Sequence, residues 1–102
     1  MVQLIERHRD QLARLCRKYD VRRLDLFGSA ARGKFDEEHS DLDFLVLFCR
    51  TSRTSLADRY LGLQEDLAKL LGRKIDLVDV TAARNPYFIS EALKQRVMLY
   101  AA

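Results

Sequence analysis

The hydrophobic positions between residues 4 and 19 recur at helical spacing. They form one stripe, with arginines mostly on the opposite side, and comprise Leu4, Ile5, His8, Leu12, Leu15, Cys16 and Tyr19. Such spacing is typical of an amphipathic helix. We therefore predict a helix over Leu4–Tyr19, whose arginine-rich face is either solvated or in contact with an anionic partner. His8, at the edge of the stripe, is interpreted as a packing residue.

Two later stretches show the alternation of strands. The first is predicted over Val21–Phe27 and ends at Gly28-Ser29, after which a short helix is expected. The second is predicted over Asp41–Phe48. Its alternation places Asp41, Asp43, Leu45 and Leu47 on one face, opposite Leu42, Phe44, Val46 and Phe48. Two carboxylates therefore share one side of this strand.

The remaining chain predicts a helix, a strand and a final helix. Ser55 and Asp58 resemble a capping box, and leucines then recur at helical spacing up to Gly72. A strand is predicted over Lys74–Val80 and a last helix over Pro86–Tyr100. The last helix carries a row of side chains that is either core or a partner-binding face: Tyr87, Phe88, Leu93, Val97 and Tyr100. The order α-β-α-β-α-β-α predicts an α+β fold with a small mixed sheet flanked by helices.

Composition restricts the class of protein. The chain has 102 residues, 48% of them hydrophobic and 32% charged, which predicts a single globular domain over residues 1–102. No long apolar run predicts a membrane span. The net charge of +3 is compatible with phosphate-bearing partners, but direct nucleic-acid binding is not expected. The two cysteines form no CxxC pair and no secretory segment is recognised, so we expect a cytoplasmic location.

The chemistry is concentrated in two short segments. Gly28 and Ser29 end a strand and open a helix, where free backbone N–H groups, a glycine and a hydroxyl favour phosphate binding. Asp41 and Asp43 follow after a polar loop, and their oxygens suit Mg²⁺ with positions left for water and substrate phosphates. Taken alone, Gly-Ser is usually a turn and Asp-x-Asp a solvated strand face.

Asp76 adds a third carboxylate on a strand that could lie beside this pair. Two metal ions about 3.5–4 Å apart could then stabilise the attacking and leaving oxygens of a phosphoryl displacement. Asp76 would help to deprotonate the attacking hydroxyl. The order of strand, Gly-Ser, acidic pair and later acid therefore predicts nucleotidyl transfer.

These residues resemble the minimal nucleotidyltransferases (MNT proteins) of the DNA polymerase beta superfamily. The resemblance runs from Val21 through Tyr100, and its motifs are Gly-Ser followed by Asp-x-Asp and the extension Gly-Ser-x-Ala-Arg-Gly at residues 28–33. It implies Mg²⁺ on Asp41, Asp43 and Asp76, with Gly28 and Ser29 on the triphosphate of ATP. Arg32 either contacts the nucleotide phosphates or a partner, or forms a salt bridge with the acidic loop at residues 36–38.

The resemblance also implies a biological role. Similar proteins are antitoxins that act with an all-helical HEPN ribonuclease and have been linked to adenylylation of a tyrosine on that partner. Two alternatives stay open: a module of the same fold that neutralises its partner by occlusion, and a catalytic subunit that acts on another substrate.

Overall fold

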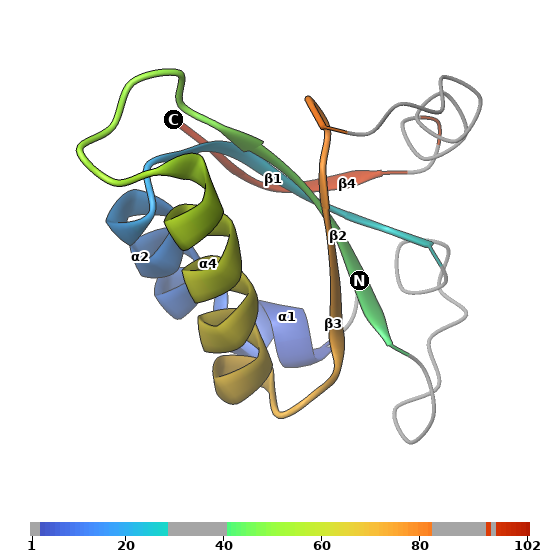
Figure 1. Cartoon of the computed structure of the whole chain (residues 1–102). Coiled ribbons are helices and arrows are strands. Elements are labelled where there is room, and N and C mark those ends of the chain that lie inside the picture. The colour runs from blue at the N-terminus through green and yellow to red at the C-terminus, as the bar shows by residue number, and fades with distance from the viewer. Residues whose placement is uncertain (1–2, 29–40, 83–93, 95) are drawn as a thin grey trace.

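The computed structural model describes residues 3–28, 41–82, 94 and 96–102 (Figure 1). The predictions for Ser29, Arg32 and the acidic loop at residues 36–38 therefore lie outside the described residues. The same holds for the short helix expected after Ser29 and for the part of the predicted last helix before residue 94, with Tyr87, Phe88 and Leu93. The elements follow in the order α1 (Gln3–Arg7), α2 (Arg9–Lys18), β1 (Val21–Phe27), β2 (Leu42–Phe48), α4 (Leu56–Leu71), β3 (Ile75–Asp79) and β4 (Val97–Ala101).

The strands form one mixed sheet in the order β3-β2-β1-β4. Strand β1 pairs antiparallel with both β2 and β4, whereas β2 and β3 run parallel. A parallel pair needs a crossover that returns the chain to the same end of the sheet, and α4 provides it. The predicted α+β class with a small mixed sheet is confirmed.

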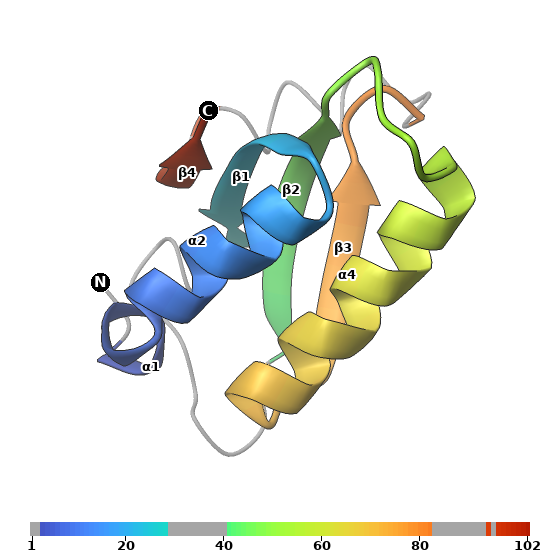
Figure 2. The ribbon, with the colours of Figure 1, turned by 90° about the vertical axis from the view of Figure 1, so that its left-hand side faces the viewer.

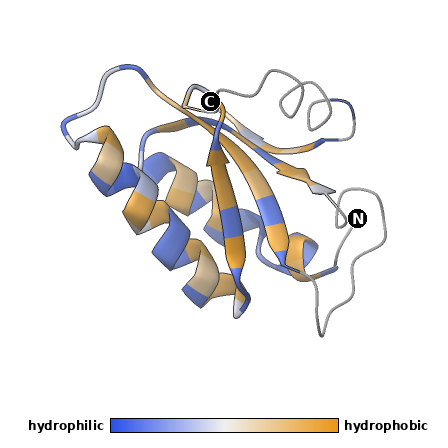
Figure 3. Ribbon diagram, turned by 45° about the vertical axis from the view of Figure 1, so that its right-hand side comes forward, coloured by the Kyte–Doolittle hydropathy of each residue, from blue (hydrophilic) through white to orange (hydrophobic). Residues whose placement is uncertain are grey.

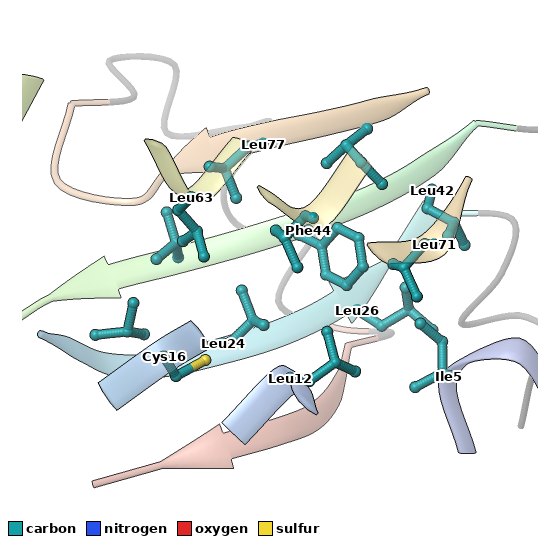
Figure 4. Close-up of a cluster of buried hydrophobic side chains, with 14 of the residues drawn as sticks. Ile5, Leu12, Cys16, Leu24, Leu26, Leu42, Phe44, Leu63, Leu71 and Leu77 are labelled. Atoms are coloured by element: carbon teal, nitrogen blue, oxygen red, sulfur yellow. The ribbon is translucent and has the colours of Figure 1, made fainter. Parts of the chain in front are cut away.

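Helices α1, α2 and α4 lie together on one face of the sheet (Figure 2). The core is formed where their apolar stripes meet the alternating apolar residues of β1, β2 and β3. Figure 4 shows this cluster, in which the side chains of Leu12 and Cys16 from α2 and Leu63 from α4 lie over Leu24 and Phe44 of the sheet. All five are at most 1% exposed.

The caps of α4 match the prediction. The Ser55 hydroxyl accepts a hydrogen bond from the Asp58 backbone N–H at 3.2 Å, and Gly72 ends the helix with φ of 64°. Figure 3 shows hydrophilic and hydrophobic residues alternating around this helix, while the strands are mainly hydrophobic. No helix within the described ranges is long and apolar enough to cross a membrane.

Two predicted helices differ from the structure. The helix predicted over Leu4–Tyr19 is divided at His8. The His8 ring Nδ1 donates to the Leu4 carbonyl at 2.8 Å, and the His8 backbone N–H donates to the Ile5 carbonyl at 3.1 Å. The final helix predicted over Pro86–Tyr100 was wrong for residues 97–100, which belong to the segment Val97–Ala101. This segment is strand β4, because it pairs with the otherwise open edge of β1.

The opposite face of the sheet carries a second, smaller apolar cluster. Phe27 and Leu45 are buried there, with Val78 and Val80 packed against them. Asp43 and Asp76 belong to this face by strand alternation, and none of α1, α2 and α4 covers it. The predicted acidic site and the helical layer are therefore on opposite sides of the sheet.

Candidate functional site

The site begins where β1 ends beside β2. Phe27 is the register partner of Asp43, and Gly28 follows with φ of 71°, a conformation that favours glycine. A Cβ on residue 28 would lie 2.2 Å from Asp43 Oδ2. The Asp43 carboxylate therefore rests against the main chain of Gly28, and a larger residue would displace it.

The next strand brings a second carboxylate to this place. Asp43 and Asp76 are register partners in the parallel pair of β2 and β3. Neighbouring strands lie about 4.8 Å apart, and partners at one register position project to the same face. Asp43 is half-buried and Asp76 is exposed. The structure thus places two of the three predicted acids side by side at the edge of an open face.

Asp41 lies one residue before β2, and its carboxylate pairs with Lys74. Its Oδ2 is 3.9 Å from Lys74 Nζ, and both side chains are exposed, so the ion pair adds little stability. No group of three or more His, Cys, Asp or Glu side chains in the described part of the chain is close enough to hold a metal ion. Asp43 and Asp76 supply hard oxygen donors that fit a Mg²⁺ whose other ligands are water and phosphate.

A third acid on the same face has a different environment. Asp25 is buried, with Arg23 Nε 3.0 Å from both of its carboxylate oxygens and Arg96 Nη1 3.7 Å from Oδ2. Two cations compensate this carboxylate, which fits a structural role. Sequence reasoning did not single it out, although a charged residue inside a predicted strand is the signal that could have done so.

Helix α4 contacts the strand that carries Asp76. Tyr60 Oη donates to the Leu77 carbonyl at 2.5 Å, and Gln64 Nε2 donates to the Ile75 carbonyl at 3.4 Å. Burial, and then the negative charges of Asp76 and Asp79, raise the pKa of Tyr60, so its hydroxyl remains a donor at neutral pH. In the sequence, Tyr60 is only one of the apolar positions within the predicted helix.

An apolar groove of about 630 Å³ lies beside this contact. It is lined by α4 and by the end of β3, including Leu56, Tyr60, Leu61, Leu77 and Val78. The acidic pair is not part of its lining. The groove and the acidic pair are therefore separate features of the surface around β3.

A family model described as "Nucleotidyltransferase domain" matches residues 8–99. The chain belongs to this family. A protein of Methanocaldococcus jannaschii named "Putative protein adenylyltransferase MJ1379" is 46% identical over 70 residues, which cover 69% of this chain and 68% of that protein. The expected membership of the nucleotidyltransferases is confirmed, and the residue roles within the site stay predictions.

Solved structures show the same fold. One described as "Structure of putative minimal nucleotidyltransferase" aligns with a TM-score of 0.77 and 28% identity over 93% of this chain and 92% of that one. A toxin-antitoxin structure with AMP-PNP aligns at 0.73 and 25% identity over 92% and 73%. A complex of tri-AMPylated Shewanella oneidensis HEPN toxin with MNT antitoxin aligns at 0.68 over 96% and 73%; its 22% identity supports the fold alone.

Proposed function

We propose that this chain is a Mg²⁺-dependent adenylyltransferase that modifies a HEPN ribonuclease and so acts as its antitoxin. The observation that carries the proposal is the register of β2 and β3, which sets Asp43 beside Asp76 with Gly28 against the Asp43 carboxylate. Two neighbouring carboxylates on one open face supply the oxygen ligands that Mg²⁺ prefers, so their pairing favours a metal-dependent activity.

The residues divide into two groups. Asp41, Asp43 and Asp76 would hold the metal, and Gly28 with Ser29 and Arg32 would hold the triphosphate. Bound Mg²⁺, expected as two ions, would neutralise the triphosphate and orient it for displacement. Asp41 is exposed and only loosely paired with Lys74, so its side chain can turn toward the other two acids at little cost.

In the proposed reaction, the oxygen of a protein hydroxyl forms a bond to the α-phosphorus of ATP. The bond between that phosphorus and the oxygen of the β-phosphate breaks, and pyrophosphate leaves. The hydroxyl proton passes to a carboxylate oxygen of Asp76, which is the more exposed of the paired acids and can reach an incoming acceptor.

The choice of ATP and of a HEPN partner is supported by the relatives. One similar structure contains AMP-PNP within a toxin-antitoxin complex, and another contains an AMPylated HEPN toxin with its MNT antitoxin. The relative from Methanocaldococcus jannaschii bears the name of a protein adenylyltransferase. An ATP-dependent reaction on a ribonuclease would take place in the cytoplasm.

The experiment mixes a substoichiometric amount of the chain with the proposed HEPN partner, ATP and Mg²⁺, and then measures the partner's intact mass. Turnover should add one or more adenylyl groups to every partner molecule. Asp76→Asn should abolish the addition, while Asp10→Asn, which removes an exposed carboxylate of α2, should retain it. Transfer would be refuted, and occlusion established, if the unaltered chain adds no mass to the partner while an equimolar amount of the Asp76→Asn variant still inhibits it.

A further inference from the structure

Strand β3 lies at one end of the described sheet, so one of its edges has no strand partner there. Edge carbonyls need other hydrogen-bond donors, because an unsatisfied backbone group costs stability. Helix α4 supplies two of them. Tyr60 Oη donates to the Leu77 carbonyl, and Gln64 Nε2 to the Ile75 carbonyl.

The spacing of these two bonds is matched between helix and strand. Tyr60 and Gln64 are four residues apart on α4, a rise of about 6 Å. Ile75 and Leu77 are two residues apart on β3, a rise of about 6.6 Å. The helix runs antiparallel to the strand, so the earlier donor meets the later carbonyl. One helical turn is thus bonded to Ile75 and Leu77 of β3, and Asp76 lies between these two residues.

We infer that Tyr60 and Gln64 are positioning residues that hold Asp76 level with Asp43. The inference rests on the proposed function. The two donors act through the backbone of β3, because α4 lies on the helical face while Asp76 belongs to the opposite face. The inner edge of β3 is held by its parallel pairing with β2. The two bonds from α4 fix its outer edge, so the strand cannot tilt or slide the carboxylate away from its neighbour.

The test compares variants that lose one hydroxyl. Tyr60→Phe removes the bond to β3 and keeps the ring that packs against the core. Tyr19→Phe is the matched control, since Tyr19 also packs on the core but its hydroxyl donates to Asp66 of α4 and does not touch β3. Gln64→Met removes the weaker donor at similar volume.

Three quantities are measured on the full chain: Mg²⁺ affinity by calorimetry, hydrogen exchange of the β3 amides, and kcat and KM for ATP. We expect the double variant Tyr60→Phe/Gln64→Met to bind Mg²⁺ more weakly and to lower kcat by roughly tenfold, because losing the support of a metal ligand commonly has an effect of this size. Tyr60→Phe alone should show the larger part of both effects. Exchange in β3 should accelerate, and KM for ATP should change less than kcat. Tyr19→Phe should alter none of these.

The outcomes separate this inference from the proposed function. If the unaltered chain transfers adenylyl groups and Tyr60→Phe matches Tyr19→Phe in Mg²⁺ affinity, kcat and exchange, the positioning role is refuted alone. If the unaltered chain binds Mg²⁺ but transfers nothing, the proposed function fails. The positioning role then stands if Tyr60→Phe binds Mg²⁺ more weakly than Tyr19→Phe, and is refuted if the two variants bind it equally well. A chain that binds no Mg²⁺ would refute both.

Discussion

At the scale of single residues, two glycines with positive φ in the described part of the chain allow a controlled comparison. Gly28 and Gly72 have φ of 71° and 64°, so alanine at either position should cost about 1–2 kcal/mol of backbone strain. A Cβ at Gly28 would also strike Asp43, whereas one at Gly72 has no atom within 4 Å. We predict that Gly28→Ala destabilises the fold more than Gly72→Ala and also weakens Mg²⁺ binding.

Urea denaturation and calorimetric titration with Mg²⁺ measure both effects. Because Gly72→Ala carries the backbone strain without the collision, it should lose stability and keep its Mg²⁺ affinity. Equal stability losses together with unchanged Mg²⁺ binding in Gly28→Ala would show that the close approach to Asp43 has no functional role.

The candidate site was only partly predictable from residues. Alternation is a local pattern, and it correctly placed Asp43 and Asp76 on strands. That these two are register partners depends on how β2 and β3 pair, which no local pattern encodes. Asp41 lies one residue before β2, and no local pattern predicts that its carboxylate pairs with Lys74. The hydrogen bond from Tyr60 to β3 joins distant segments and left no signal beyond an apolar helical position.

At the scale of elements, the packing of α2 against α4 depends on Gly62. A Cβ there would lie 2.6 Å from Tyr19 Cε1, while the Tyr19 hydroxyl is held by Asp66. Alanine normally stabilises a helix interior by about 1 kcal/mol relative to glycine. Overpacking costs about 1–3 kcal/mol. We predict that the collision prevails and that Gly62→Ala lowers the free energy of unfolding.

A double-mutant cycle with Tyr19→Ala tests the cause. Once the ring is removed, Gly62→Ala should become stabilising by about 0.5–1 kcal/mol, because only the helix preference remains. A destabilising Gly62→Ala in both backgrounds, measured by urea denaturation, would locate the conflict elsewhere.

Elements were predicted best where local signals agreed. Helix α4 has a capping serine, an apolar stripe and a terminal glycine, and its predicted bounds match the structure. The segment Val97–Ala101 fits helical spacing with the residues before it, but its β-branched and aromatic side chains also suit a strand. Pairing with β1 decided between them. Contacts of this range override a weak local preference.

At the scale of the whole molecule, one continuous core links the helices to the sheet, and Cys16 lies inside it with 0% exposure. Burial raises the pKa of its thiol to about 12, against an ordinary value of 9.0. A raised pKa means that the associated stability is complete below pH 9.0 and is lost as the pH rises toward 12. We predict a steeper loss of stability above pH 9.0 in the unaltered chain than in Cys16→Ala.

Chemical denaturation at several alkaline pH values measures this slope, which one group can change by at most about 1.4 kcal/mol per pH unit. Cys49→Ala is the control, since Cys49 is only half-buried and lies outside the core cluster. Identical slopes for Cys16→Ala and the unaltered chain would contradict the prediction.

The acidic pair should link metal binding to the stability of the whole fold. Like charges at one register position of neighbouring strands oppose folding, so Asp76→Asn should stabilise the chain in EDTA. In Mg²⁺ at 100 times its dissociation constant, binding should add about 2.7 kcal/mol to the unaltered chain and little to the variant. We therefore predict that their melting temperatures reverse order when Mg²⁺ replaces EDTA. Asp10→Asn, which removes a distant surface carboxylate, should show the same Mg²⁺ response as the unaltered chain. If Asp76→Asn retains the full Mg²⁺ response, the ion is bound without Asp76, and the pairing of β2 with β3 does not create the metal site.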